Sequence, residues 1–226
     1  MNLREGNTIT DLWGFGLADW FRTQSAKVFG QPKPVVVVTP SPATAQAIKA
    51  FLLKDNIPVM GIEFWRPADL RRFLAAANGW KLPVDDPRLI AAGVRSVAGE
   101  IAAGEPSNAT AQAVSRSAQA LADTIIMLEA AGWTHAEIKA EPLRLVAERF
   151  FANVSALNAE TVGRFDFRLL SNAKGKAPVL ASILIAGFDG AHWEHWPVLA
   201  AAATLAQDVF VTLPIAHEAA GAADMI

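Results

Sequence analysis

The segment Ile185-Ala-Gly-Phe-Asp189 places a carboxylate directly after a very apolar run of the chain. In nucleotide-hydrolysing α/β domains, an Asp in this position helps to hold the Mg²⁺ ion, and a further residue orients the attacking water. No Glu stands next to Asp189. Asp189 could hold a metal ion, or it could cap the turn into the following helix. The segment therefore does not by itself predict hydrolysis.

The segment His192-Trp-Glu-His195 is a second candidate because it carries two imidazoles three residues apart. On a helix this spacing brings both side chains to one face, where they could ligate zinc. The spacing is not that of H-E-x-x-H, and no third ligand is evident nearby. Trp193 and Trp196 interleave with the histidines, which favours packing or surface contacts. The sequence predicts no metal site; His192 and His195 are the residues that would form one.

Phosphate binding is the third chemistry to consider. A Walker A loop, G-x-x-x-x-G-K-[ST], is absent. Gly14-Phe-Gly16 lacks the lysine, and we expect it to follow no strand and to lie within a helix. Three arginines, Arg66, Arg71 and Arg72, come just after a predicted strand and could contact phosphate or form a solvated face. No serine has a His/Asp partnership at a recognisable spacing, so nucleophilic catalysis is not predicted.

The composition excludes several classes of protein. The 226 residues include no cysteine, which excludes disulfide frameworks, Cys-ligated zinc or iron–sulfur sites and thiol nucleophiles. With 52% hydrophobic residues and a formal net charge of -2, the chain is neither disordered nor strongly basic. No apolar stretch reaches the roughly 18 residues of a membrane-spanning helix. The first ten residues carry no targeting signal. We expect a cytoplasmic protein with no membrane contact and no cofactor.

Strands and helices alternate in the first part of the chain. The β-branched run from Val35 to Thr39 is typical of a strand buried on both faces of a parallel sheet. Ser41-Pro42 predicts the start of a helix that runs to about Lys54. The segment from Ile57 to Phe64 predicts a second strand, and a helix follows Arg66-Pro67. This alternation indicates an α/β domain.

The middle of the chain changes character and predicts mainly helix. We expect helices from Pro87, over 107–131 and after a capping box at Thr134-His-Ala-Glu137. Strands return at 179–186 and 209–213, on either side of a helix over 193–206. The prediction is an α/β domain in two parts, 1–85 and 171–226, with an inserted all-helical subdomain over 86–170. Because the sequence stops soon after a core strand, we expect it to be an N-terminal piece of a longer protein.

The strand-and-helix segments from Val35 and from Gly61, and above all ILIAGFDGAHWEHWPVLAAAATLAQDVFVTLP from Ile183 to Pro214, resemble a known family. They are similar to the N-terminal helicase-like region of AddB-like proteins. These are the B subunits of bacterial helicase–nucleases, also catalogued as PD-(D/E)XK nuclease family proteins. The resemblance spans nearly the whole chain and implies a degenerate P-loop-helicase-like sheet. It implies a role in DNA double-strand-break repair and recombination, with DNA and a helicase–nuclease partner subunit as partners.

The resemblance also assigns roles to residues. Gly187, Phe188 and Asp189 stand where active helicases have the Asp-Glu motor motif, so ATP hydrolysis by this chain is not expected. Thr39 and Ser41 match the position of motif Ia and could donate hydrogen bonds to single-strand phosphates, with Arg66 or Arg71 assisting. They could equally end a strand and cap a helix. The family's exonuclease lies in a region that this sequence does not contain.

The sequence thus leads to three hypotheses. The first is a non-catalytic, helicase-like scaffold or single-strand DNA guide within a repair helicase–nuclease. The second is a free-standing α/β enzyme, or a nucleotide- or sugar-binding domain, with its site at the carboxyl ends of the strands. The third is a structural module that buries its Ala-rich helices against another subunit.

Overall fold

The computed structural model describes residues 2–5, 16–104 and 109–213, and the chain divides into two compact units. One unit comprises residues 1–78 and 170–226, and the other comprises residues 79–169. Residues 79–85, expected in the α/β part, group with the helical unit, where Val84 forms an isolated parallel bridge with Thr161.

The first unit is built on one parallel sheet, which confirms the predicted α/β class. Among the described residues it has five strands in the order β1-β5-β4-β2-β3, and every neighbouring pair is parallel. The strands are β1 (Asn2–Glu5), β2 (Val35–Val38), β3 (Ile62–Trp65), β4 (Leu180–Ala186) and β5 (Ala206–Leu213).

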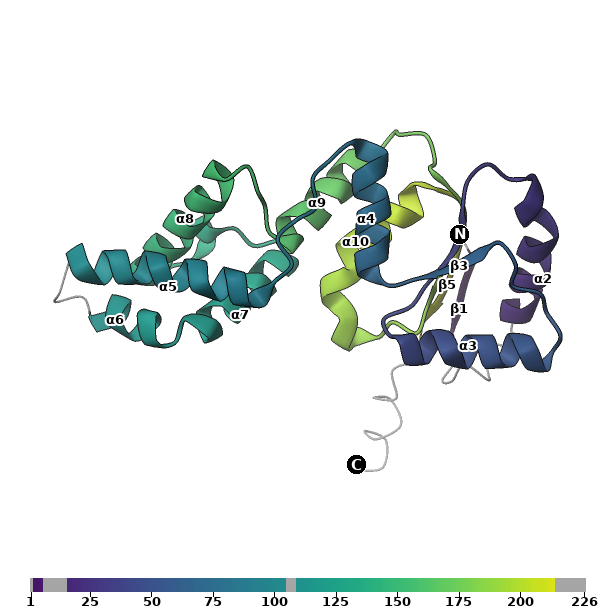
Figure 1. Ribbon diagram of the computed structural model, residues 1–226, viewed down its shortest axis with the longest axis horizontal. Coiled ribbons are helices and arrows are strands. Elements are labelled where there is room, and N and C mark those ends of the chain that lie inside the picture. Colours follow the sequence, from purple (N-terminus) through teal and green to yellow (C-terminus); the bar gives the residue numbers. More distant parts are fainter. Residues whose placement is uncertain (1, 6–15, 105–108, 214–226) are drawn as a thin grey trace, which may run out of the picture. The chain divides into compact units, whose positions relative to one another are not determined.

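Helices cover both faces of this sheet (Figure 1). On one face lie α2 (Ala18–Lys27) and α3 (Pro42–Lys54), whose Phe21, Ile48 and Leu52 form a core with the β2 side chains. On the other lie α4 (Pro67–Asn78) and α10 (Trp196–Thr204). Every residue of β2 and β4 is buried, as expected for inner strands of a parallel sheet.

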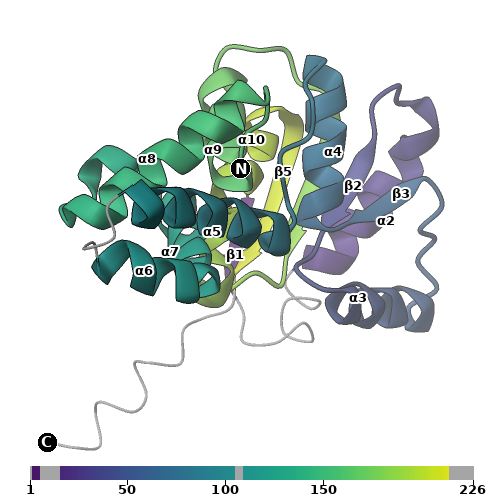
Figure 2. The same ribbon diagram turned by 60° about the vertical axis from the view of Figure 1, so that its left-hand side comes forward.

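The second unit is helical, with α5 at its centre (Figure 2). Against α5 (Pro87–Gly104) pack α6 (Ala109–Arg116), α7 (Ala118–Ala130) and α8 (Glu141–Ala156). Their shared core includes Val94, Ile125 and Phe150. The last helix, α9 (Val162–Ala173), begins in this unit and ends in the other. In the part of the chain that the structure describes, no helix is both long and apolar enough to cross a membrane.

Three local predictions were wrong, and a fourth holds only in part. The helix expected over 107–131 is broken at Ser117, which has non-helical dihedral angles, so that α6 and α7 both pack on α5. The second strand begins only at Ile62, because Pro58 and the positive φ of Gly61 make the preceding residues a turn. The helix expected from Trp193 starts as a 3₁₀ segment, Gly190–His195. The capping box at Thr134 is present, but on a short 3₁₀ turn, His135–Glu137.

Gly163 allows α9 to approach α7 closely. A Cβ atom there would lie 2.7 Å from Glu129 Cβ and 2.8 Å from the Glu129 carbonyl carbon, which is backbone and cannot move alone. We expect Gly163→Ala to lower the free energy of unfolding by about 2 kcal/mol, measured by urea denaturation.

Gly99→Ala is the matched control for this substitution. Gly99 lies inside α5 with nothing within 4 Å of the new Cβ, so we expect it to raise stability by up to about 1 kcal/mol. Equal effects of the two substitutions would contradict the close approach.

Candidate functional site

The direction of the chain across the sheet reverses between β2 and β4. From β2 the chain steps outward to β3, and from β4 it steps the opposite way to β5. In open α/β sheets, ligands bind in the crevice outside the carboxyl ends of the strands at such a switch point. Thr39 follows β2 and Gly187 follows β4, so the topology makes the edge of the sheet between these two strand ends, which we call the α3 crevice, the candidate site.

Thr39 and Ser41 occupy the β2 side of the crevice. Thr39 is buried; its backbone N–H donates to the Trp65 carbonyl at 3.0 Å, and its hydroxyl donates to the Ser41 carbonyl at 3.2 Å. The Ser41 Oγ accepts from the Thr44 backbone N–H at 3.2 Å and lies 3.0 Å from Thr44 Oγ1. Ser41 is therefore the N-cap of α3, as predicted. In the first turn of α3, Pro42 has no N–H and the amides of Thr44 and Ala45 donate to Ser41, which leaves the amide of Ala43 as the donor at this edge of the sheet.

Gly187 forms the opposite side and contacts the same helix. Its φ of +79° is unfavourable for other residues, and a Cβ atom there would lie 2.6 Å from Thr44 Cγ2. The turn after β4 thus presses against the first turn of α3. The structure brings Gly187 together with the Thr39–Ser41 segment through Thr44, a residue that the sequence analysis did not single out.

The side chains of the two residues after Gly187, Phe188 and Asp189, are engaged in packing and in capping. Phe188 is fully buried, with its ring 5.7 Å from His192 and 6.3 Å from His195 between centroids. Asp189 caps the 3₁₀ segment: its Oδ1 accepts from the Ala191 N–H at 2.9 Å and lies 2.7 Å from His192 Nδ1. These hydrogen bonds, that of Ala191 first, hold the pKa of Asp189 below its ordinary value. Of the two alternatives for Asp189, the structure shows the cap.

The three arginines do not form one cluster. Arg71 is 6% exposed and places Nη2 3.4 Å from His195 Nδ1. Arg66 and Arg72 are exposed, and both pair with Asp69: Arg66 Nε at 3.6 Å and Arg72 Nη1 at 3.1 Å. Only Arg66 and Arg72 are therefore placed to meet a ligand from solvent.

His192 and His195 lie on the 3₁₀ segment and do not converge as a ligand pair. His192 has non-helical dihedral angles, and His195 faces Arg71. Among the described residues, no group of three or more His, Cys, Asp or Glu side chains is placed to hold a metal ion. Burial, then the positive charge of Arg71, lowers the pKa of His195 to about 4. His195 is neutral at pH 7 and can accept a hydrogen bond from the guanidinium.

The sequence analysis missed β1. This strand precedes α2 along the chain, and residues 6–15 between them lie outside the described residues. The expectation for Gly14-Phe-Gly16 stays a prediction, because Gly14 and Phe15 are among those residues; Gly16 precedes α2. The segment 6–15, GNTITDLWGF, contains no lysine. Asn2–Glu5 holds a single large apolar residue, Leu3, so a strand could not be predicted there from the sequence.

No protein-family model matches the chain, and no curated protein is significantly similar to it. The crevice must therefore be interpreted from its own residues. Among the described residues these offer one backbone amide, that of Ala43, two hydroxyl groups and the exposed Arg66 and Arg72, and Asp189 is engaged as a cap.

Gly187→Ala tests the contact between the β4 turn and α3. The added Cβ would be strained by the positive φ and would clash with Thr44, so we expect a loss of about 2–3 kcal/mol in the free energy of unfolding. Gly175→Ala is the control, because Gly175 has a φ of +75° and nothing within 4 Å; we expect about 1 kcal/mol. Adding Thr44→Ala to Gly187→Ala should recover the difference. A simple sum of the two single effects would argue against the contact.

The low pKa of His195 predicts a pH dependence of stability. Between pH 6.5 and about 4, the unfolded chain binds a proton at His195 that the folded chain excludes, so stability falls as pH falls. The slope from this group is at most about 1.4 kcal/mol per pH unit. Urea denaturation at pH 7, 6 and 5 should give a flatter profile for His195→Gln than for the natural chain. A profile for His195→Gln as steep as that of the natural chain would be evidence against this assignment.

Proposed function

We propose that the chain is a degenerate helicase-like module that contacts single-stranded DNA and does not hydrolyse ATP. Three features support this proposal. The parallel sheet has its switch point where the sequence resembles helicase motifs, and the helical unit intervenes between α4 and β4. The strand β1 also precedes the helix α2 along the chain, and the sequence between them, residues 6–15, contains no lysine.

The proposal rests mainly on which residues stand at the carboxyl end of β4. An active motor needs an acid there to hold Mg²⁺ and a lysine in the loop after β1 to hold the phosphates. Here the β4 end is Gly187-Phe188, the Phe188 ring fills the space against two histidines, and Asp189 is used as a cap. Both groups that would hold Mg²⁺–ATP are absent from these two positions. A motor domain that has kept its sheet and no longer hydrolyses ATP would account for the absence of both groups.

The DNA-binding part of the proposal rests on the other side of the crevice. The N-terminus of α3 offers the backbone amide of Ala43 next to Ser41, and helix ends of this kind bind phosphate. Arg66 and Arg72 stand exposed after β3. Phosphate contacts of this kind position a strand without reading its sequence. Because the chain carries a net charge of -2, we expect weak and strongly salt-dependent binding.

In this proposal the module belongs to an AddB-like helicase–nuclease that acts in double-strand-break repair in the cytoplasm. Nuclease chemistry would come from another part of that protein, and a partner helicase subunit would supply ATP hydrolysis. The chain would serve as a guide or scaffold for the strand that the complex processes.

A purely structural role is the second candidate, and one surface favours it. Phe29, Leu53 and Met60 are each more than two-thirds exposed. The segments that carry Phe29 and Met60 adjoin, since a Cβ on Gly61 would lie 2.8 Å from Val28 Cγ2. Exposed apolar side chains of this size are typical of protein interfaces.

The double variant Arg66→Ala/Arg72→Ala tests the proposed contact of these two arginines with single-stranded DNA. We expect it to weaken binding of a fluorescein-labelled 20-nucleotide oligo-dT about three- to tenfold at 50 mM KCl, and less at 200 mM KCl, in fluorescence anisotropy. The helix start should survive, because Asp69 still accepts from the backbone N–H of residue 66. Arg88→Ala/Arg95→Ala removes the same charge from exposed positions on α5 and should change binding less than twofold.

Three results would count against this function. Equal weakening by both double variants would show that only net charge matters. No DNA binding at 50 mM KCl would favour the structural role. Low-micromolar affinity for ATP with Mg²⁺ would contradict the degenerate motor, because the groups that hold the phosphates are missing.

A further inference from the structure

The helical unit contains a hollow of about 530 Å³, within the size range of ligand sites. It lies between the segment that enters the unit at Gly79, the end of α8 with its following turn, and α9. Its lining combines one indole ring with basic and amide side chains. Those that bear on its chemistry are Trp80, Lys81, Ser155, Asn158, Arg164 and Arg168.

Arg168 and Trp80 form a fixed stack on this lining. The guanidinium carbon of Arg168 lies 3.7 Å from the Trp80 ring centroid. Arg168 Nε donates to Glu160 Oε2 at 3.2 Å, and Arg168 Nη2 contacts the other Glu160 oxygen. The edge of the Trp80 ring meets Phe165 at 82° between the ring planes. Two flat groups are thus held in place before any ligand arrives.

Arg164 repeats this arrangement one helical turn earlier. Its guanidinium carbon lies 3.7 Å from the Phe151 ring centroid, and its Nε lies 2.9 Å from Glu129 Oε1. Its Nη2 is 3.3 Å from His135 Nδ1. A guanidinium fixed in this way loses little freedom on binding phosphate.

The charge of the lining differs from that of the chain. Three cationic side chains and one carboxylate, that of Glu160, line the hollow, whereas the whole chain has a net charge of -2. Two of these cations are paired with carboxylates, and the third, Lys81, is exposed. Ser155 and Asn158 add hydrogen-bonding groups at the rim. The hollow therefore offers a positive, hydrogen-bonding wall beside a flat stacking surface.

We propose that this hollow binds a nucleotide unit, with its base against the Trp80–Arg168 stack and its phosphate near Lys81 and Arg164. Nucleic-acid bases stack on indole rings and on guanidinium planes without strong preference for one base. The same chemistry would accept a nucleotide within a single strand or a free nucleoside monophosphate. This site lies in the helical unit and does not depend on the α3 crevice of the proposed function.

Two variants of the intact chain test the stack and the charge. We expect Trp80→Leu to weaken binding of labelled dT12 about tenfold in fluorescence anisotropy. Lys81→Glu should weaken it several-fold at 50 mM KCl, and less at 200 mM KCl. Since Trp80 is packed on Phe165, its replacement could unfold the unit; Lys81 is exposed, so Lys81→Glu tests the site without that risk.

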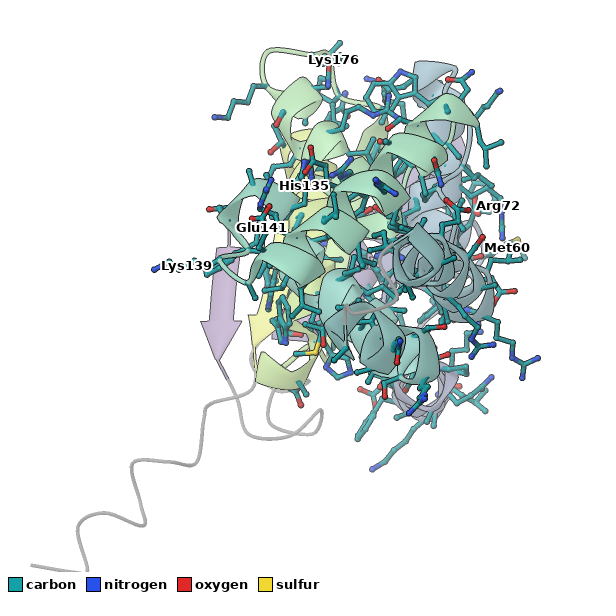
Figure 3. All side chains as sticks on the ribbon, turned by 90° about the vertical axis from the view of Figure 1, so that its left-hand side faces the viewer. Met60, Arg72, His135, Lys139, Glu141 and Lys176 are labelled. Atoms are coloured by element: carbon teal, nitrogen blue, oxygen red, sulfur yellow. The ribbon has the colours of Figure 1, made fainter. Side chains whose placement is uncertain are left out.

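Matched controls come from the same unit. Trp133→Leu removes an indole that is half exposed, and Lys139→Glu reverses a lysine that extends away from the helices (Figure 3). Neither residue lines the hollow. Both control variants should bind dT12 within twofold of the natural chain, and losses equal to those of Trp80→Leu and Lys81→Glu would overturn the proposal.

A direct readout separates this site from the α3 crevice. Photo-cross-linking with dT12 that carries 5-iododeoxyuridine should modify the peptide that contains Trp80, also in the Arg66→Ala/Arg72→Ala background. Cross-links confined to the α/β unit, with no effect of Lys81→Glu, would overturn the proposal and leave the proposed function intact. If Trp80 is cross-linked and Arg66→Ala/Arg72→Ala leaves DNA binding unchanged, the site in the hollow is supported and the DNA contact of the proposed function is contradicted.

Competition distinguishes the two sources of the ligand. Millimolar dTMP should displace dT12 from the cross-link at Trp80 if a free nucleotide suffices. If dTMP fails while dT12 still cross-links there, the site is specific for a strand. Displacement by inorganic phosphate as efficient as that by dTMP would show that the base contributes nothing, and would overturn the proposal.

Discussion

The structure of the α/β unit depends on the burial of β2 and β4 on both faces. Val35–Val38 and Leu180–Ala186 carry almost only apolar side chains, and every one of these residues is buried. A strand of this kind is stable only where helices cover both sides of the sheet. Consecutive strands must therefore be joined by helical crossovers, and crossovers on opposite faces require the chain to step in opposite directions from β2 and β4. The switch point, and with it the candidate crevice, follows from this burial.

The same packing determines which side chains occupy the end of β4. A metal-binding acid there would have to stay ionised at the edge of an apolar core, which is costly without a cation. In this chain the position is filled by the Phe188 ring, and the next residue, Asp189, is held by a backbone amide and His192. Gly187 lets the turn close onto Thr44. The buried Phe188 ring and the tight contact with α3 are thus parts of one local arrangement.

Sequence predicted the features that local interactions determine. The buried β2 run and the Ser41-Pro42 helix start are set by neighbouring residues, and both are present. The short strand β1 is different, because Asn2–Glu5 becomes a strand only by pairing with β5, some 200 residues away. The arginines show the same limit within the site. Arg71 and Arg72 are adjacent on α4, about 100° apart around the helix, so packing buries one and exposes the other. Sequence alone could not separate them.

The buried and stacked arginines share a principle that links the two units. A guanidinium can leave water only where its charge is matched or its face is covered. Arg71 is buried and places its Nη2 beside His195, whose lowered pKa keeps the imidazole neutral and able to accept a hydrogen bond. Arg164 and Arg168 achieve it with a carboxylate and an aromatic ring each. The difference in exposure decides which arginines can contact a ligand. Arg71 is buried beside His195, whereas Arg164 and Arg168 line the open hollow. Recognition of an anion by the helical unit is therefore compatible with stable internal ion pairs.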